Sequence, residues 1–285
     1  MILTKTLSKK SNIPKLNKNT VIKKIDITNF QKVGKVIESF KPDLIIHLAG
    51  NTSHSKSFEK PLQDVDSNIK TTLFMLEKIK QLKLPCRFIL GSTFIVIGKP
   101  KKLPVNEDTP CNPTTIYGTN RLASEHLCKI YNELYGIKTN VFRITNSYGP
   151  REQIIPNKNA VNFLIHKSFK KEKISIYNKG EFFRDLIYVD DVISGINTII
   201  KKGKTGEIYW ISSGTKTWFK KFAEILQQTT NCEIDYPKTP NYTKKVDVGN
   251  FVVNNSKLKK LGWSPKVSIN EGVKKTIDFF SANQT

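Results

Sequence analysis

Several features that mark membrane, secreted or metal-binding proteins are missing from this 285-residue sequence. No apolar run approaches the ~20 residues that a membrane-spanning helix needs. The segment from Met1 to Ile13 contains lysines but no apolar stretch of the length found in signal peptides. The four cysteines and four histidines are scattered, without a C-x-x-C pair. We therefore expect no disulfide framework, no metal site and no membrane partner, and a reduced, cytoplasmic setting.

Arginine is scarce, although the formal net charge is +23. Only 5 of the 47 basic residues are arginines, and the lysines occur in short groups along the whole chain, such as Lys99–Lys102, Lys170–Lys173 and Lys257–Lys260. No single basic stripe with interleaved aromatic residues is present. This distribution favours a solvated surface over a nucleic-acid-binding face, and the charge would still attract small anionic substrates.

Short apolar strands alternate with helical patterns in the first half of the chain. The predicted strands are Val21–Ile25, Leu44–Leu48, Phe88–Leu90 and Val141–Arg143, and the predicted helices are Phe30–Phe40, Asn68–Leu82 and Thr115–Tyr135. The last helix would place Leu127, Ile130, Tyr131 and Leu134 on one apolar stripe. Such alternation predicts an α/β fold with a doubly wound parallel sheet that has helices on both faces.

The pattern loosens after Tyr148-Gly149-Pro150. Lysine-rich loops follow, and then strands and helices are predicted at Ile174–Ile176, Asp191–Ile200, Ile208–Ile211, Trp218–Gln228 and Ile269–Phe280. We therefore predict a sheet domain over residues 1–150 and a smaller α/β lobe over residues 151–285, in which the Leu186–Ile211 region returns to the sheet.

Tyr117 and Arg121 stand four residues apart and would share one helix face. A free phenol has a pKa of about 10, and a neighbouring cation lowers that pKa. The pair could therefore transfer a proton to or from a sugar or alcohol hydroxyl. The same spacing also occurs on solvated helix faces, and Tyr117 could instead be a half-buried core residue.

Polar and small residues follow the predicted strands at the ends where an open α/β sheet binds its ligand. Asp26-Ile27, Ala49-Gly50, Gly91-Ser92-Thr93 and Asn146 each follow one strand. Tyr117 and Arg121 precede the last of these strands. We expect these loops to converge on one crevice that holds a hydroxyl, a phenol and a cation.

Specific sequence motifs occur in a recognisable order over nearly the whole chain. They are Asp26-Ile27-Thr28, His47-Leu48-Ala49-Gly50, Ser57 with Pro61-Leu62 and Asn68, Gly91-Ser92-Thr93 through Gly98, Glu107-Asp108-Thr109-Pro110, Tyr117 to Arg121, Arg143 to Asn146, Tyr148-Gly149-Pro150, Arg184 to Val192, and Leu261-Gly262-Trp263-Ser264-Pro265. On these motifs the chain resembles the extended short-chain dehydrogenases/reductases of the NAD-dependent epimerase/dehydratase family, which act on nucleotide sugars.

The resemblance implies a Rossmann-like first domain that binds NAD or NADP, a nucleotide-diphosphate-sugar substrate and a homodimer formed through the helices of Asn68 and Tyr117. Tyr117 would be the general base, Thr93 would hydrogen-bond the same sugar oxygen, and Arg121 would hold the nicotinamide ribose where the family has lysine. The other implied cofactor residues are Asp26 and Ile27 at the adenine, with Leu48, Ala49, Gly50 and Ser92 along the cofactor and Asn68 supporting the helix of Tyr117. Asn146 and Arg184 would face the substrate diphosphate.

Plainer interpretations stay open for four of these features. Thr93 could only cap a turn, and Arg184 could form a surface ion pair with Asp185 or Asp190. The Asp190-Asp191 pair is typical of a helix start rather than a metal site. His47 on an apolar strand is expected to be structural.

The chain departs from the family pattern in two places. Arginine at position 121 keeps the charge, but it cannot copy the contacts of an ammonium group to two ribose hydroxyls. No G-x-x-G-x-x-G or G-x-G-x-x-G segment is present, so we expect a βα unit of ~30 residues, the pyrophosphate cradle and the central strand to be lacking. Either the reading frame starts late or cofactor binding is impaired. Leu3-Thr4-Lys5 has no acidic residue at the strand end, which favours NADP over NAD.

The residues after Thr93 narrow the choice of reaction. The 4,6-dehydratases of the family carry an acidic pair there, whereas this chain has Phe94 and Ile95, which cannot exchange protons. The Ala49–Asn68 stretch looks most like UDP-glucose 4-epimerases, so we predict epimerisation at C4 through a transient 4-keto sugar. A one-way 4-keto reductase and a non-catalytic family remnant are the alternatives. Sugar specificity would lie in the loops over residues 154–173 and 237–248.

Overall fold

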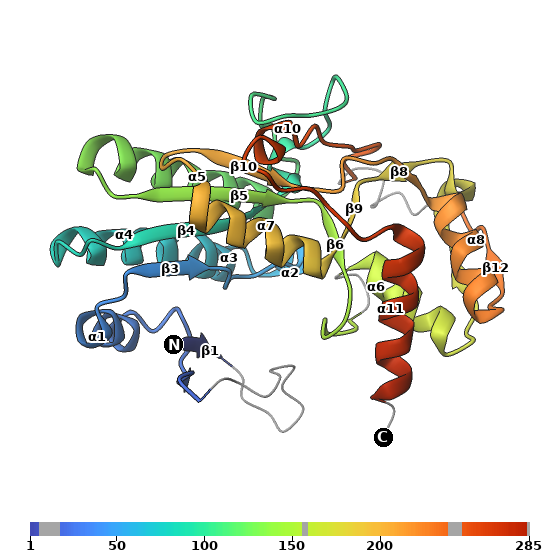
Figure 1. Ribbon diagram of the computed structural model, residues 1–285, viewed down its shortest axis with the longest axis horizontal. Coiled ribbons are helices and arrows are strands. Elements are labelled where there is room, and N and C mark those ends of the chain that lie inside the picture. Colours follow the sequence, from blue (N-terminus) through green and yellow to red (C-terminus); the bar gives the residue numbers. More distant parts are fainter. Residues whose placement is uncertain (6–17, 156–158, 239–246, 284–285) are drawn as a thin grey trace.

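The computed structural model describes residues 1–5, 18–155, 159–238 and 247–283 (Figure 1). Its main sheet consists, in these ranges, of four parallel strands in the order β10-β5-β4-β3. They are β3 (Leu44–His47), β4 (Arg87–Thr93), β5 (Thr139–Ile144) and β10 (Ile208–Ile211). β10 comes from the second half of the chain and pairs with β5, so both halves contribute to one sheet.

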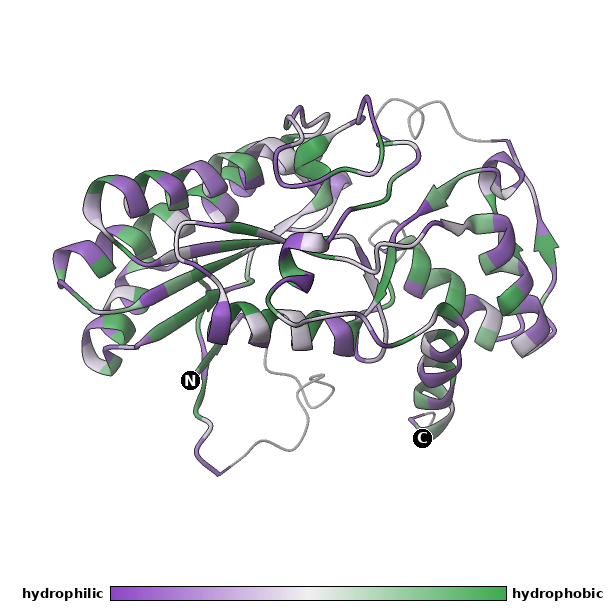
Figure 2. Cartoon of the chain, turned by 45° about the horizontal axis from the view of Figure 1, so that its top comes forward, coloured by the Kyte–Doolittle hydropathy of each residue, from purple (hydrophilic) through white to green (hydrophobic). Residues whose placement is uncertain are grey.

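Helices cover both faces of this sheet, as the doubly wound prediction requires (Figure 2). On one face, Phe88 and Leu90 of β4 pack with α1 (Phe30–Phe40), α4 (Thr71–Gln81) and α5 (Ile116–Tyr135). On the other face, Ile89 of β4 and Phe142 of β5 pack with α7 (Val189–Lys202). Successive strand residues thus face opposite layers, and both layers are apolar because the sheet is covered on both sides.

A second, two-stranded parallel sheet lies apart from the main one. It pairs β1 (Ile2–Thr4) with β2 (Ile22–Lys24). No strand in the described ranges pairs with the free edge of β3, and Ile46 and Leu48 there are 40% and 58% exposed. The predicted sheet is therefore present in two pieces, with the unpaired edge where the sequence predicts a missing central strand.

Two other sequence-based expectations for the first half need correction. The predicted helix Asn68–Leu82 is interrupted, because residues Asp66–Lys70 form a π-helical turn, η1, before α4 begins. The predicted apolar stripe of α5 is only partly buried, since Tyr131 is buried but Ile130 and Leu134 are 44% and 72% exposed. α5 instead buries Tyr117, Arg121, Ser124, Glu125 and Cys128. Two short helices, α2 (His54–Glu59) and α3 (Pro61–Val65), precede η1.

The second half forms a lobe around its own apolar core. Its strands pair as β6 (Asn146–Tyr148) with β9 (Leu186–Tyr188), β8 (Phe183–Arg184) with β11 (Thr217–Trp218), and β7 (Ile174–Ser175) with β12 (Ile234–Asp235). Its helices are α6 (Ala160–Phe169), α8 (Phe219–Thr230) and α11 (Ile269–Ala282), whereas Leu258 of the short helix α10 (Ser256–Lys259) packs on the main sheet. The prediction of loops after Pro150 is wrong for residues Ala160–Phe169, which form α6. Asn159 is the N-cap of this helix. Residues 239–246 of the other predicted specificity loop lie outside the described ranges.

Candidate functional site

Tyr117 lies in the first turn of α5, where the helix passes close to the end of β4. Thr115 caps the helix by accepting a hydrogen bond from the Gly118 N–H at 3.0 Å. A Cβ at Gly118 would come within 2.9 Å of Pro113 and 3.0 Å of Ile95, so glycine permits this close approach. The short 3-10 helix η2 (Phe94–Ile97) follows Thr93 directly. Tyr117 is thereby brought against the end of β4.

The side chains of Tyr117 and Thr93 are both buried, and the Thr93 hydroxyl is close enough to influence the pKa of the phenol. Burial raises the pKa of Tyr117, because the phenolate loses solvation, while Arg121 and Thr93 lower it by less. The predicted direction of the Arg121 effect is therefore right, but the expected net fall in the pKa of Tyr117 is wrong. Thr93 Oγ1 also accepts from the Ile95 N–H at 3.3 Å, so the turn-capping interpretation holds as well.

Arg121 is buried one turn beyond Tyr117, beside Asn68 of η1. Its Nη1 donates to Asn68 Oδ1 at 3.3 Å, and its Nε has no hydrogen-bond partner. The Asn68 carbonyl accepts from Ser124 of α5 at 3.0 Å, which joins η1 to the helix of Tyr117. A Cβ at Gly50 would lie 2.3 Å from Asn68 Oδ1, so glycine lets the end of β3 approach the same cluster.

These residues fit one end of the nicotinamide cofactor that the resemblance implies. A buried guanidinium with an unpartnered N–H has spare donor capacity for ribose hydroxyls. Leu48, Ala49 and Gly50 are exposed at the end of β3 beside it. We assign no residues to a pyrophosphate, because the sequence contains no Gly-rich turn that could present backbone N–H groups to it.

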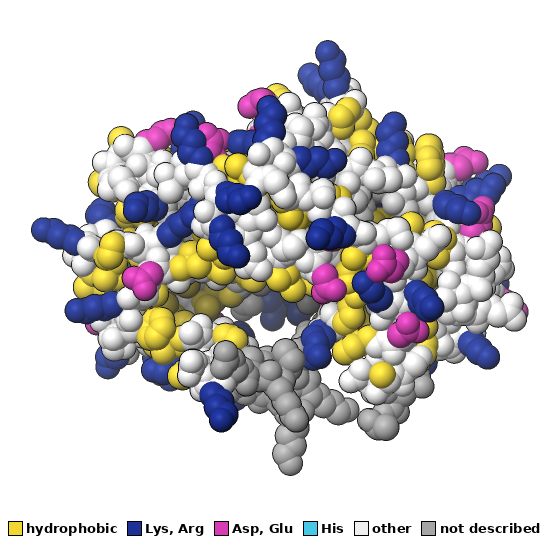
Figure 3. All heavy atoms as spheres, viewed as in Figure 1, with side chains coloured by type: hydrophobic (Ala, Val, Ile, Leu, Met, Phe, Trp, Pro, Cys, Tyr) yellow, Lys and Arg dark blue, Asp and Glu magenta, His cyan; other side chains and the backbone are white. Residues whose placement is uncertain are grey.

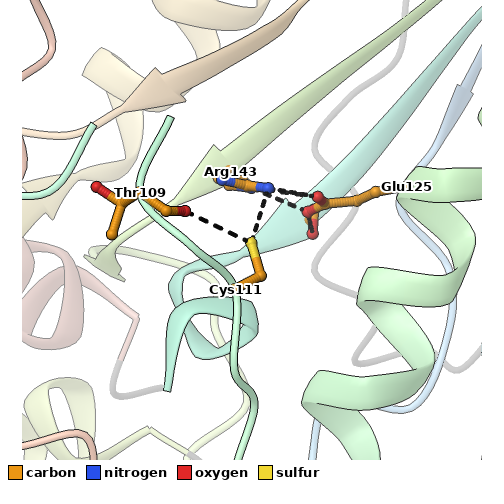
Figure 4. Close-up of polar contacts among 5 residues, drawn as sticks. Thr109, Cys111, Glu125 and Arg143 are labelled. Carbon is orange, nitrogen blue, oxygen red and sulfur yellow. Dashed lines mark hydrogen bonds and ion pairs between the residues drawn. The ribbon is translucent and has the colours of Figure 1, made fainter. Parts of the chain in front are cut away.

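A buried ion pair lies deeper in the same region (Figure 4). Arg143 of β5 donates through Nη2 to Glu125 of α5 at 2.7 Å and to Cys111 Sγ at 3.2 Å. Ser92 of β4 hydrogen-bonds Glu125 as well. Ser92, predicted as a cofactor residue, is therefore engaged with Glu125 and joins the end of β4 to α5.

The predicted phosphate-binding residues lie in the second lobe. Arg184 is buried and donates to Asp247 and to the Gly249 carbonyl, so neither Asp185 nor Asp190 is its partner and it is not a surface pair. Asp185 instead accepts from Ser213. Asn146 begins β6 and donates its N–H to the Asp185 carbonyl at 3.2 Å.

The predicted adenine residues, Asp26 and Ile27, directly follow the small sheet. Asp26 follows β2 and accepts from the Thr28 N–H at 3.0 Å and from Lys5 at 2.7 Å. The hydrogen bond from Lys5 holds the pKa of Asp26 below its ordinary value. Ile27 packs against the apolar core of the main sheet. Both predicted residues therefore lie between β2 and α1, and Ile27 faces the core of the main sheet.

His47 is buried in the fold, and the Asp190-Asp191 pair lies at the start of a helix, as their plainer interpretations predict. His47 is buried against Thr71, and burial lowers the pKa of its imidazole to about 3. Asp190 and Asp191 lie in the first turn of α7, where Asp191 accepts from the backbone N–H groups of Lys266 and Val267. No group of three or more His, Cys, Asp and Glu is placed to bind a metal ion in the described ranges.

Lys and Arg side chains are scattered over the face drawn in Figure 3, with fewer Asp and Glu among them. Among the helices that the structure describes, none combines the length and apolar character needed to cross a membrane.

A family model described as GDP-mannose 4,6 dehydratase matches residues 3–276. The chain belongs to this family, within the NAD-dependent epimerase/dehydratase group of the extended short-chain dehydrogenases/reductases. The resemblance inferred from the motifs is confirmed, as is the Rossmann-like fold. The family consists of NAD-dependent nucleotide-sugar epimerases and 4,6-dehydratases, so the expectation of an enzyme family also holds.

Relatives within the family carry out both reactions. A Methanocaldococcus jannaschii protein provisionally named UDP-glucose 4-epimerase is 28% identical over 94% of this chain and 88% of its own length. Human dTDP-D-glucose 4,6-dehydratase is 29% identical over 90% of this chain and 74% of its own. The structure of Thermotoga maritima UDP-glucose 4-epimerase with UDP-glucose superimposes with a TM-score of 0.87 at 27% identity, covering 96% of this chain and 90% of that one. More distant structures of the same fold are complexes with NAD or NADPH.

Sequence reasoning missed three polar residues beside the site. No sequence motif marks them. His54 contacts Tyr117, Asp64 accepts a hydrogen bond from Asn120 on the helix of Tyr117, and Asp247 accepts one from Arg184. Their partners lie far away in sequence, and only the folded chain brings them together.

Proposed function

We propose that this protein epimerises a nucleotide sugar at C4, with NAD or NADP as the bound cofactor. The observation that carries the proposal is the buried pair of Tyr117 and Thr93 at the end of β4, with Arg121 one turn away. Tyr117 would take the proton of the sugar hydroxyl, and Thr93 would hold that oxygen in place. When bound, the nicotinamide would supply a hydride acceptor and donor. Lys5 at the end of β1, in place of an acidic residue, favours NADP.

The residues after Thr93 support epimerisation over dehydration, although dehydratases are equally prominent among the relatives. Phe94 packs on Phe251, with ring centroids 5.1 Å apart, and Ile95 is buried. Neither side chain can donate or accept the protons that elimination of water requires. Arg184 and Asn146 are proposed to bind the substrate diphosphate, which would compete with Asp247 for the guanidinium. With four free cysteines in the structure, we propose a cytoplasmic setting.

The test is incubation of the purified protein with UDP-glucose or UDP-galactose and NAD(P), with the products resolved by chromatography. Interconversion without net consumption of NAD(P)H supports the proposal. Stoichiometric oxidation of NADPH with a 4-keto sugar would instead show a reductase. Release of a 4-keto-6-deoxy product would show a dehydratase.

Arg121 should set the pH dependence of Tyr117. The base form is the phenolate, so kcat/KM should rise with pH towards the pKa of Tyr117. Arg121 lowers that pKa, and we therefore expect Arg121→Met to move the rising limb to higher pH. Arg121→Lys, which keeps the charge, should leave the limb nearly in place. A pH–rate profile that is the same in Arg121→Met and in the unaltered protein would contradict this role.

We also propose a homodimer formed through α4 and α5. Ile130 and Leu134 leave an apolar surface on α5 that a second copy would bury. Leu134→Lys should therefore convert the dimer to a monomer, as measured by light scattering after size exclusion. Ile193→Lys is the matched control, because Ile193 is 53% exposed on α7, the helix that covers the opposite face of the sheet. A monomer before substitution would contradict the proposal.

A further inference from the structure

His54 places an imidazole directly beside Tyr117. It opens α2, immediately after the loop that follows β3, and Ser53 caps this helix. The rings of His54 and Tyr117 lie edge to face, with centroids 5.5 Å apart and an interplanar angle of 88°. A titratable ring from a different loop thus contacts the side chain that is proposed to act as the base.

A buried carboxylate, that of Asp64, connects the segment before His54 to the helix of Tyr117. Asp64 is 1% exposed and accepts hydrogen bonds from Asn51 Nδ2 at 2.5 Å and from Asn120 Nδ2 at 2.7 Å. Asn51 lies three residues before His54, and Asn120 lies three residues after Tyr117 on α5. Asp64 therefore ties the loop of His54 to the helix of Tyr117, and a satisfied buried polar network of this kind holds its members in one geometry.

Within the described residues, neither ring nitrogen of His54 forms a hydrogen bond. Nδ1 is fully buried without a hydrogen-bond partner. In the described ranges no hydrogen bond engages Nε2, this atom is not among the fully buried unpartnered ones, and His54 as a whole is partly exposed. Burial lowers the pKa of His54, and Asp64 raises it by less. Burial thus favours the neutral ring, in which Nε2 can either donate an N–H or accept through its lone pair.

We infer that His54 is a specificity-determining residue that hydrogen-bonds, through Nε2, a sugar hydroxyl adjacent to the one that Tyr117 deprotonates. The inference rests on the proposed function, because it takes a nucleotide sugar as the substrate. A neutral hydrogen bond between the ring and a hydroxyl would strengthen sugar binding without a charge, which suits an uncharged hexose. Phe94 and Ile95 on the β4 side offer no polar atom for the same purpose.

The experiment uses calorimetry with NADP present to compare the binding of UDP and of UDP-glucose to the unaltered protein, His54→Phe and His54→Gln. Phenylalanine keeps the ring against Tyr117 but removes both nitrogens. Glutamine offers an amide nitrogen at a similar distance from the backbone. We expect His54→Phe to weaken UDP-glucose binding about 10-fold and to leave UDP binding unchanged. His54→Gln should recover most of that loss.

Two other patterns of binding overturn the inference. Equal UDP-glucose affinities in the unaltered protein and His54→Phe would show that the imidazole only packs. An equal loss for UDP and UDP-glucose would show a structural effect on the whole site. Because binding is measured separately from turnover, a His54-dependent sugar affinity without interconversion would overturn only the proposed reaction. Absence of any binding of UDP or UDP-glucose to the unaltered protein would overturn both.

Discussion

Glu125→Ala is expected to lower the free energy of unfolding by about 3–5 kcal/mol. Glu125 and Arg143 are 2% and 3% exposed, and the carboxylate receives hydrogen bonds from Arg143 and Ser92. Removing it would leave the guanidinium buried without a counter-charge. Arg143 Nη1 already has no hydrogen-bond partner, so the remaining contacts cannot compensate. Denaturant unfolding followed by circular dichroism measures the change.

Two variants show whether the effect comes from buried charge. Glu125→Gln keeps the shape and part of the hydrogen bonding, but it also leaves Arg143 without a counter-charge, so it should be clearly destabilising. Glu133→Ala on the same helix removes an exposed ion pair with Lys129, whose atoms are 3.8 Å apart. Such surface pairs contribute about 0–1 kcal/mol. A loss for Glu125→Ala no larger than that for Glu133→Ala would refute the explanation.

The apolar parts of the fold were predictable because their local patterns are strong. The helix Phe30–Phe40 has the predicted bounds, since its apolar period is regular and Asn29 caps it. The prediction for α5 fails on Ile130 and Leu134, because a period alone cannot show that the inward face of this helix is polar. That face carries Glu125, whose partner, Arg143, lies on strand β5. A pattern that places only apolar residues inside cannot find such a pair.

The candidate site could be predicted where each residue follows a strand or stands in a motif. Thr93 and Tyr117 meet as expected, since parallel strands end at one edge of the sheet. Asp64 and Asp247 could not be found in this way, because they act on Asn120 and Arg184 across 56 and 63 residues. The sequence also could not predict that the pKa of Tyr117 is raised overall, because this shift depends on how far the phenol is buried.

Tyr117→Phe is expected to reduce kcat/KM for the interconversion of UDP-glucose and UDP-galactose by a factor of about 10²–10⁴. The phenol lies within the influence of both the Thr93 hydroxyl and the Arg121 charge. Phenylalanine fills the same volume and keeps the edge-to-face contact with His54. The fold and the affinity for UDP should therefore be nearly unchanged, and the loss should fall on kcat.

Tyr131→Phe is the matched control for this prediction. Tyr131 lies on the same helix, but its hydroxyl is bonded to Glu77 of α4, away from Thr93. We expect its kcat/KM to stay within a few-fold of the unaltered protein, because no proton transfer is assigned to it. Activity of Tyr117→Phe comparable to that of Tyr131→Phe would show that another group supplies the base. A loss in both variants, together with lower thermal stability, would attribute the effect to packing of α5 on the sheet.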